Sequence, residues 1–141
     1  TQASYRDFVL VVEWRFPEQP GNGGVLLRLD GPDKVWPRSI EAQLQSGSAG
    51  DIWNIDEFGM SVARDRTNGR HTRGMQPSSE KPLREWNRYE IVVNGDALRL
   101  TVNGVVQNEA FGCEHIAGPI ALQAEGAAME FRRIELREIR R

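Results

Sequence analysis

Carboxylate and amide side chains alternate along one stretch of this chain in a pattern that suits the binding of hydroxyl groups. Residues 39–45 read Ser-Ile-Glu-Ala-Gln-Leu-Gln, with a polar residue at every second position. Side chains of a β-strand point alternately to opposite faces, so Glu41, Gln43 and Gln45 share one face of the predicted strand. Each amide offers both donors and acceptors to a ligand hydroxyl. The pattern predicts a strand whose polar face holds a sugar.

A second strand of the same character is predicted at residues 120–125. There Gln123 and Glu125 share one face, while apolar residues occupy the other. Gln123 is a predicted substrate-binding residue, and Glu125 is a candidate second catalytic carboxylate. Two carboxylates about 5–10 Å apart would suit ordinary glycoside hydrolysis. Whether Glu125 lies opposite Glu41 depends on strand order, which the sequence leaves open.

Glu41 is the first candidate for a catalytic carboxylate, and Arg28 is its candidate partner. Arg28 lies in another predicted strand, residues 24–29. One interpretation places both residues in a catalytic site, and the other makes them a structural ion pair. The two interpretations are compatible, because an arginine partner would keep Glu41 ionised and oriented.

Four further residues are predicted to surround the polar face. Trp36 and Trp53 flank the Glu41 strand, where each could stack on a sugar ring. Asn22, beside three glycines, is a candidate substrate-binding residue, although holding a tight turn is the alternative. His71 lies in the irregular segment 46–82 and could overhang the site as an acid or a base, or could simply be solvated.

No metal or cofactor is expected from the residue pattern. Cys113 is the only cysteine, so neither an intramolecular disulfide nor a thiolate cluster can form. The two histidines, His71 and His115, lie in different segments and show no metal-binding spacing. A metal held by His71, Glu41 and Asp51 is conceivable, but no motif supports it.

Composition narrows the class of protein. The chain has 141 residues, of which 39% are hydrophobic and 27% charged, which predicts one globular domain over residues 1–141. The net charge of −2 comes without a basic stripe, which argues against a nucleic-acid partner. No run of about 18 apolar residues occurs, so membrane insertion is not expected.

Short alternating segments separated by Gly, Pro and Asn turns predict an all-β fold. Two Asn-Gly pairs, at residues 94–95 and 103–104, predict type I′ hairpins. A change of apolar register between Phe131 and Ile134 predicts a bulge. The fold class is a two-sheet antiparallel β-sandwich of jelly-roll type. Its predicted strands are residues 8–16, 24–29, 39–45, 51–55, 59–63, 86–93, 98–102, 105–106, 120–125 and 129–139.

A series of short motifs runs in the order found in the 3-keto-disaccharide hydrolase-like family, and the chain resembles that family over nearly its whole length. The motifs are Tyr5-Arg6-Asp7-Phe8-Val9-Leu10, Gly21-Asn22-Gly23-Gly24-Val25 with Arg28, Ile40-Glu41-Ala42-Gln43-Leu44, Gly50-Asp51-Ile52-Trp53, Glu85-Trp86-Asn87-Arg88-Tyr89-Glu90, Val102-Asn103-Gly104, Gly118-Pro119-Ile120-Ala121-Leu122-Gln123 and Phe131-Arg132-Arg133-Ile134. The resemblance implies a concanavalin A-like lectin/glucanase sandwich.

The chain departs from the family pattern in two places. Family members usually carry strands ahead of the Tyr5 position, so this chain is expected to be a fragment or a shortened member. Many relatives have a His-Gly pair where this chain has Glu125-Gly126. An identical mechanism would therefore need another residue in place of that histidine.

The resemblance implies a secreted or periplasmic bacterial protein whose partner is an oligosaccharide or glycoside, cleaved as its 3-keto form. A carbonyl at C3 acidifies the C2 proton, so cleavage needs a base at C2, a group that polarises the carbonyl, and an acid at the leaving oxygen. The alternative is a non-catalytic carbohydrate-binding module on the same sandwich. Fold alone does not separate the two.

Overall fold

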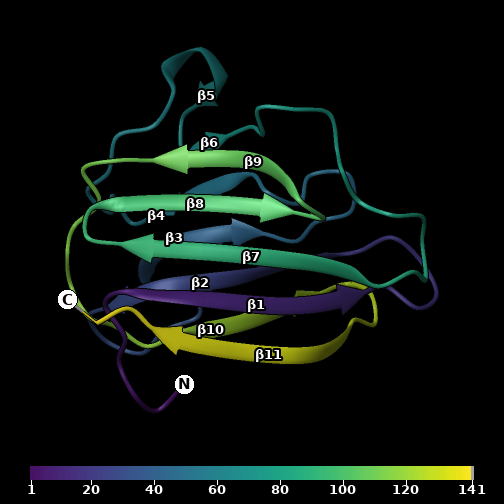
Figure 1. The fold of residues 1–141 in the computed structure, drawn as a ribbon, viewed down its shortest axis with the longest axis horizontal. Helices are drawn as coiled ribbons and strands as arrows, with labels where there is room; N and C mark the ends of the chain where they lie inside the picture. The colour runs from purple at the N-terminus through teal and green to yellow at the C-terminus, as the bar shows by residue number, and fades with distance from the viewer. Residues whose placement is uncertain (141) are drawn as a thin grey trace.

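The computed structural model describes residues 1–140, which form two antiparallel sheets packed face to face (Figure 1). One sheet has the strand order β11-β1-β7-β8-β9 and the other β10-β2-β3-β4-β6-β5. The predicted β-sandwich is confirmed. The strands are β1 (Phe8–Arg15), β2 (Asn22–Asp30), β3 (Arg38–Gln43), β4 (Ile52–Ile55), β5 (Thr67–Asn68), β6 (His71–Thr72), β7 (Asn87–Asn94), β8 (Ala97–Val102), β9 (Val105–Ala110), β10 (Ala121–Glu125) and β11 (Glu130–Glu138).

The core lies between the sheets and is built by alternate residues of the central strands. On the five-stranded side these side chains are at most 2% exposed: Phe8, Leu10, Val12, Trp14, Tyr89, Ile91, Val93, Leu98, Leu100 and Val102. From the six-stranded side Val25, Leu27, Ile40, Ala42 and Leu44 pack against them. Burying each large apolar side chain contributes about 1.5–3 kcal/mol, so this core fixes which face of β2 and β3 points outward.

The two predicted hairpins differ in their turns. Asn103 and Gly104 both have positive φ, 49° and 81°, which confirms the type I′ turn. The other loop is Gly95–Asp96, because Asn94 still pairs with Ala97. Only Gly95 has positive φ there, 63°, which fits a type II′ turn. The predicted type I′ turn at Asn94-Gly95 is therefore wrong.

Other sequence-based predictions have mixed outcomes. The bulge in the last strand is confirmed, because the β1–β11 register shifts between Val11 and Glu13 and Arg133 has a φ of 50°. The strand predicted at 59–63 is reduced to a single bridge between Ser61 and Phe111. The irregular segment contains one short 3₁₀ turn, η1 (Arg64–Arg66), and the β5–β6 hairpin. Within residues 1–140 no helix is long and apolar enough to cross a membrane.

Arg28 lies in an irregularity of β2 and not beside Glu41. The β2–β3 register shifts between Leu27 and Asp30, and Arg28 adopts a φ of 51° within that shift. This conformation directs its side chain into the end of the sandwich, where it is 0% exposed. The predicted pairing of Arg28 with Glu41 is therefore wrong, because the bulge changes the face that strand alternation would give.

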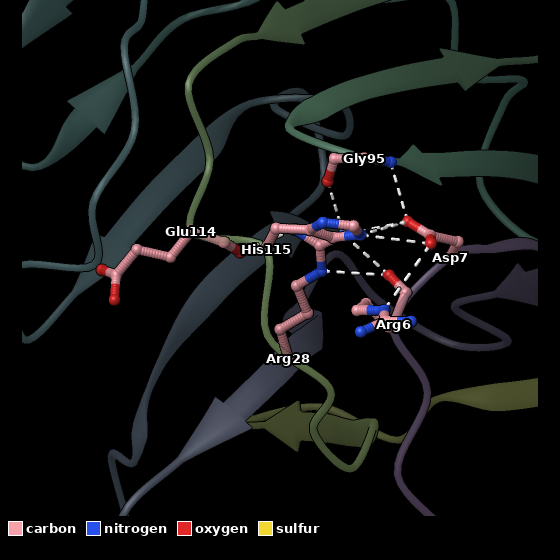
Figure 2. Close-up of polar contacts among 6 residues, drawn as sticks. All are labelled: Arg6, Asp7, Arg28, Gly95, Glu114 and His115. Atoms are coloured by element: carbon pink, nitrogen blue, oxygen red, sulfur yellow. Dashed lines mark hydrogen bonds and ion pairs between the residues drawn. The ribbon is translucent and has the colours of Figure 1, made fainter.

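The buried guanidinium of Arg28 joins segments that lie far apart in sequence (Figure 2). It donates to the carbonyl oxygens of Arg6 at 2.7 Å, Gly95 at 2.7 Å and Glu114 at 2.7 Å. Asp7, which also accepts from the Gly95 amide at 2.7 Å, lies 3.5 Å from Arg28 as the counter-charge. Arg28 thus fastens β2 to the start of β1, the β7–β8 turn and the segment that leads to β10.

Replacement of Arg28 by methionine should lower the free energy of unfolding by about 3 kcal/mol, because it leaves buried carbonyl oxygens without a donor and removes the buried counter-charge of Asp7. Chemical denaturation measures the change. The exposed Arg137 of β11 provides the matched control, since Arg137→Met should change stability by less than about 0.5 kcal/mol. Equal effects of the two substitutions would contradict a structural role for Arg28.

Candidate functional site

The register of the six-stranded sheet aligns four residues in one row across its outer face. His71 of β6 is opposite Trp53 of β4, Trp53 is opposite Glu41 of β3, and Glu41 is opposite Leu26 of β2. Directly paired residues of adjacent strands point to the same side of a sheet. Since Ile40 and Ala42 face the core, this row lies on the outer side, here called the polar face.

A hollow of about 340 Å³ opens on the polar face around Glu41, at the small end of ligand pockets. Its lining combines a carboxyl, amides, two indole rings, an aliphatic side chain and a guanidinium. The residues are Asn22, Trp36, Glu41, Gln43, Gln45, Trp53, Asn54, Ile55 and Arg70. Five of the residues predicted for the site therefore come together here: Asn22, Trp36, Glu41, Gln43 and Trp53.

The carboxyl of Glu41 is held largely out of water, and Glu41 is only 8% exposed. Burial raises the pKa of this carboxyl to about 7, and the negative charge of Glu125 contributes to the rise. The amide of Gln43 is best satisfied with its nitrogen donating to Glu41 Oε1, at 2.7 Å, and to the Gly23 carbonyl, at 3.2 Å. A carboxyl with such a pKa can take up or release a proton near neutral pH.

Gly24 gives Glu41 the space that it occupies. Gly24 lies on β2 between Gln43 and Gln123 in the sheet register. A Cβ atom at Gly24 would overlap the Glu41 side chain. The glycine therefore lets the glutamate lie across the neighbouring strand, where it loses its contact with solvent.

Trp53 stacks on a histidine whose own position is fixed by an aspartate. The rings of Trp53 and His71 stack with centroids 4.5 Å apart and planes 3° apart. His71 Nε2 lies 2.6 Å from Asp51 Oδ2, and the Gly74 amide donates to Asp51 Oδ1 at 2.8 Å. One indole face is thus covered, which leaves the opposite face for the hollow. His71 does not line the hollow, so this placement does not support the predicted acid–base role of His71.

Gln123 and Glu125 share the polar face with Glu41 but lie outside its hollow. Gln123 pairs with Gly24, and Glu125 pairs with Asn22. Glu125 lines a second hollow of about 440 Å³, which shares Asn22 and Gln45 with the first. Asn22 Nδ2 donates to Glu125 Oε2 at 3.3 Å. Standard strand spacings put the Cα atoms of Glu41 and Glu125 roughly 16 Å apart, so the catalytic role of Glu125 stays a prediction.

Four lining residues were not among the predicted site residues. Alternation already places Gln45 on the face of Glu41 and Gln43, and Ile55 follows Trp53 by two positions, so strand periodicity could have marked both as site residues. Asn54 lies between Trp53 and Ile55. Its side-chain amide donates to the Phe58 carbonyl at 2.8 Å and accepts from the Phe58 backbone N–H at 2.7 Å. Arg70 gives no periodic signal, because it lies in the turn between two-residue strands.

Within the described residues no three His, Cys, Asp or Glu side chains lie together as a metal site. Asp51 and His71 instead bond to each other. Cys113 is buried, and burial raises the pKa of its thiol to about 11, which makes it a poor nucleophile at neutral pH.

Comparison with known proteins identifies relatives of this fold. The model of a family described as the 3-keto-alpha-glucoside-1,2-lyase-like domain matches residues 1–137. No curated protein matches the chain. A candidate glycosyl hydrolase of Parabacteroides distasonis ATCC 8503 superposes with a TM-score of 0.69 at 16% identity, over 97% of this chain and 72% of its own. A second structure of that description and organism gives 0.68 at 17% identity, over 99% and 81%.

A binding module has the same architecture. The carbohydrate-binding module CBM66 of Bacillus subtilis superposes with a TM-score of 0.68 at 13% identity, over 94% of this chain and 76% of its own. Identities this low show a common fold alone. The same sandwich therefore occurs in a carbohydrate-binding module and in proteins described as candidate glycosyl hydrolases, so the fold does not by itself decide between binding and cleavage.

Replacing Glu41 by glutamine should change how stability depends on pH. The pKa of Glu41 is about 7 in the folded chain and 4.5 in its unperturbed state. Between these values the folded state binds the proton more tightly, so this group's contribution to stability falls as pH rises. The unfolding temperature of Glu41→Gln minus that of the unaltered chain should therefore increase as the pH is raised from about 4.5 to about 7. Above about pH 7 this difference should stay constant.

Thermal unfolding across this pH range provides the measurement. Glu18→Gln, at an exposed position, is the matched control and should show no such trend. A constant difference between Glu41→Gln and the unaltered chain at every pH would mean that Glu41 is not desolvated.

Proposed function

We propose that this chain, which belongs to the 3-keto-alpha-glucoside-1,2-lyase-like domain family, cleaves the glycosidic bond of 3-keto-glycosides at the hollow around Glu41. The observation that carries the proposal is a carboxyl with a pKa of about 7, held out of water in a hollow that two tryptophans and several amides line. A general base works best when its pKa lies near the working pH.

The reaction begins at the carbon next to the ketone. The ionised Glu41 carboxylate removes the C2 proton, and the C–H electron pair forms a C2–C3 double bond while the C3 oxygen becomes an enolate. When the carbonyl re-forms, the electron pair moves to make a C1–C2 double bond, and the C1 oxygen substituent leaves. The departing oxygen takes up a proton from solvent, to which Glu41 returns the proton that it removed from C2. Addition of water across the new double bond then completes a net hydrolysis.

The other lining residues supply positioning and polarisation. The open face of Trp53 offers an apolar surface for the C–H groups of a pyranose ring, and Trp36 lies on the same hollow. The amides of Gln43 and Gln45 are the donors available to a ligand carbonyl or hydroxyl. A donor aimed at the C3 oxygen would stabilise the enolate that forms there.

A second candidate function is binding of saccharides without cleavage. One observation favours it: Glu41 is the single carboxyl among the residues that line the hollow, and Glu125 lies beyond Asn22. The hollow itself therefore offers no second carboxyl to protonate the leaving oxygen. In either case the proposed partner is an oligosaccharide or glycoside, and a secreted or periplasmic bacterial location is part of the same proposal.

Glu41→Gln should lower turnover of a 3-keto-glycoside by at least about 100-fold, because the amide cannot accept the C2 proton. Chromatographic analysis of products from a 3-keto-disaccharide and from the unmodified disaccharide provides the measurement. Saccharide affinity of the variant should change little, because the amide keeps the shape of the carboxyl. Full turnover by Glu41→Gln would remove Glu41 from the mechanism, and no turnover by the unaltered chain would favour the binding function.

Trp53→Ala should weaken saccharide binding by about 1 kcal/mol, or roughly fivefold in Kd, through loss of the stacking surface. Titration of the ligand followed by nuclear magnetic resonance measures the affinity. Trp86→Ala is the matched control, because Trp86 lies between Arg15 and Arg132 of the other sheet. Equal affinities for Trp53→Ala and the unaltered chain would assign Trp53 to packing alone.

A further inference from the structure

Arg70 is the one cationic side chain among the residues that line the hollow. Within residues 1–140 its guanidinium contacts no carboxylate, whereas Arg38 pairs with Asp30 and Glu114. Arg70 also lines a neighbouring hollow of about 310 Å³, which shares Asn54 with the first. An unpaired positive charge therefore lies on the rim where two hollows meet.

A tight hairpin fixes the position of Arg70. Asn68 pairs with His71 and Thr67 with Thr72, so that Gly69 and Arg70 alone form the loop. Gly69 has a φ of 60°, a conformation that a two-residue hairpin requires and glycine adopts at little cost. The Arg70 carbonyl oxygen accepts a hydrogen bond from the backbone N–H of Asn54 at 2.9 Å, which connects the turn to β4. The backbone is thus held beside Trp53 while the guanidinium stays free.

The charges around Arg70 favour an anion on the Glu41 side of the rim. The neighbouring hollow contains Glu57, whose carboxylate would repel an anionic ligand. The first hollow has only the Glu41 carboxyl, which is 8% exposed. The remaining polar groups of its lining side chains, apart from Arg70 itself, are uncharged amides and indole N–H groups, which do not repel an anionic ligand. A guanidinium presents a planar fork of donors that matches carboxylate, sulfate and phosphate groups.

We propose that Arg70 binds an anionic substituent on the sugar that occupies the hollow, so that the preferred ligands are acidic saccharides: uronates, sugar sulfates or sugar phosphates. The inference rests on the proposed function, because it takes the hollow as the saccharide site. An acidic group at C6 is chemically compatible with a ketone at C3, so an acidic saccharide can still undergo the proposed reaction. In this role Arg70 is a specificity-determining residue, which selects the ligand by its charge.

The test compares the affinities of four probes: methyl glucoside, methyl glucuronide, glucose 6-sulfate and glucose 6-phosphate. Titrations followed by nuclear magnetic resonance at low and at physiological salt give each Kd. The unaltered chain should bind at least one anionic probe about fivefold more tightly than methyl glucoside, with a smaller preference at higher salt. The anionic probe that binds most tightly relative to methyl glucoside identifies whether the preferred group is a carboxylate, a sulfate or a phosphate.

Arg70→Gln should lose this preference and keep its affinity for methyl glucoside. Arg64→Gln removes the same charge from an exposed residue of η1 that does not line the hollow, and it should keep the preference. Circular dichroism confirms that both variants fold. Equal binding of neutral and anionic probes by the unaltered chain would overturn the role of Arg70 alone, as would a preference that survives Arg70→Gln. If the unaltered chain bound none of the probes, this inference would fail, while turnover of the 3-keto-disaccharide described above would decide the proposed function separately.

Discussion

Burial of the Glu41 carboxyl against β2 is the interaction on which the rest of the site depends. Gly24 leaves room for the side chain, and Gln43 on the same strand supplies a donor to its oxygen. Loss of water then raises the pKa of the carboxyl to about 7. A solvated glutamate on the same sheet would stay ionised at neutral pH and would be a weaker base. The chemistry available to the hollow thus follows from one glycine in the adjacent strand.

The scaffold keeps this arrangement rigid from two directions. Beneath the polar face, Ile40 and Ala42 pack into the core, so Glu41 cannot change sides without exposing them. Beside it, Trp53 is stacked on His71, which Asp51 holds at 2.6 Å. Sites built on strands with supporting hydrogen bonds hold their geometry better than sites built on loops.

Strand alternation predicted much of the fold and of the polar face, because it depends only on neighbouring residues. It placed Glu41, Gln43 and Gln45 together, and the register confirms that Gln123 shares their face. It failed for Arg28, since a bulge with a φ of 51° reverses the direction that alternation gives. It could not locate Arg70 or the stacking of His71 on Trp53, because these follow from a two-residue hairpin paired across the sheet. Distances across strands, including the one between Glu41 and Glu125, require strand order.

The most direct test of the account uses the four tryptophans as reporters of where a saccharide binds. Trp36 and Trp53 line the hollow, Trp14 is in the core, and Trp86 lies on the other sheet. Four indole N–H signals can be followed while a 3-keto-disaccharide or an acidic glycoside is added. The account predicts that the signals of Trp36 and Trp53 shift with one common affinity while the other two stay in place. Shifts confined to Trp86, or none at any concentration, would contradict a saccharide site on the polar face.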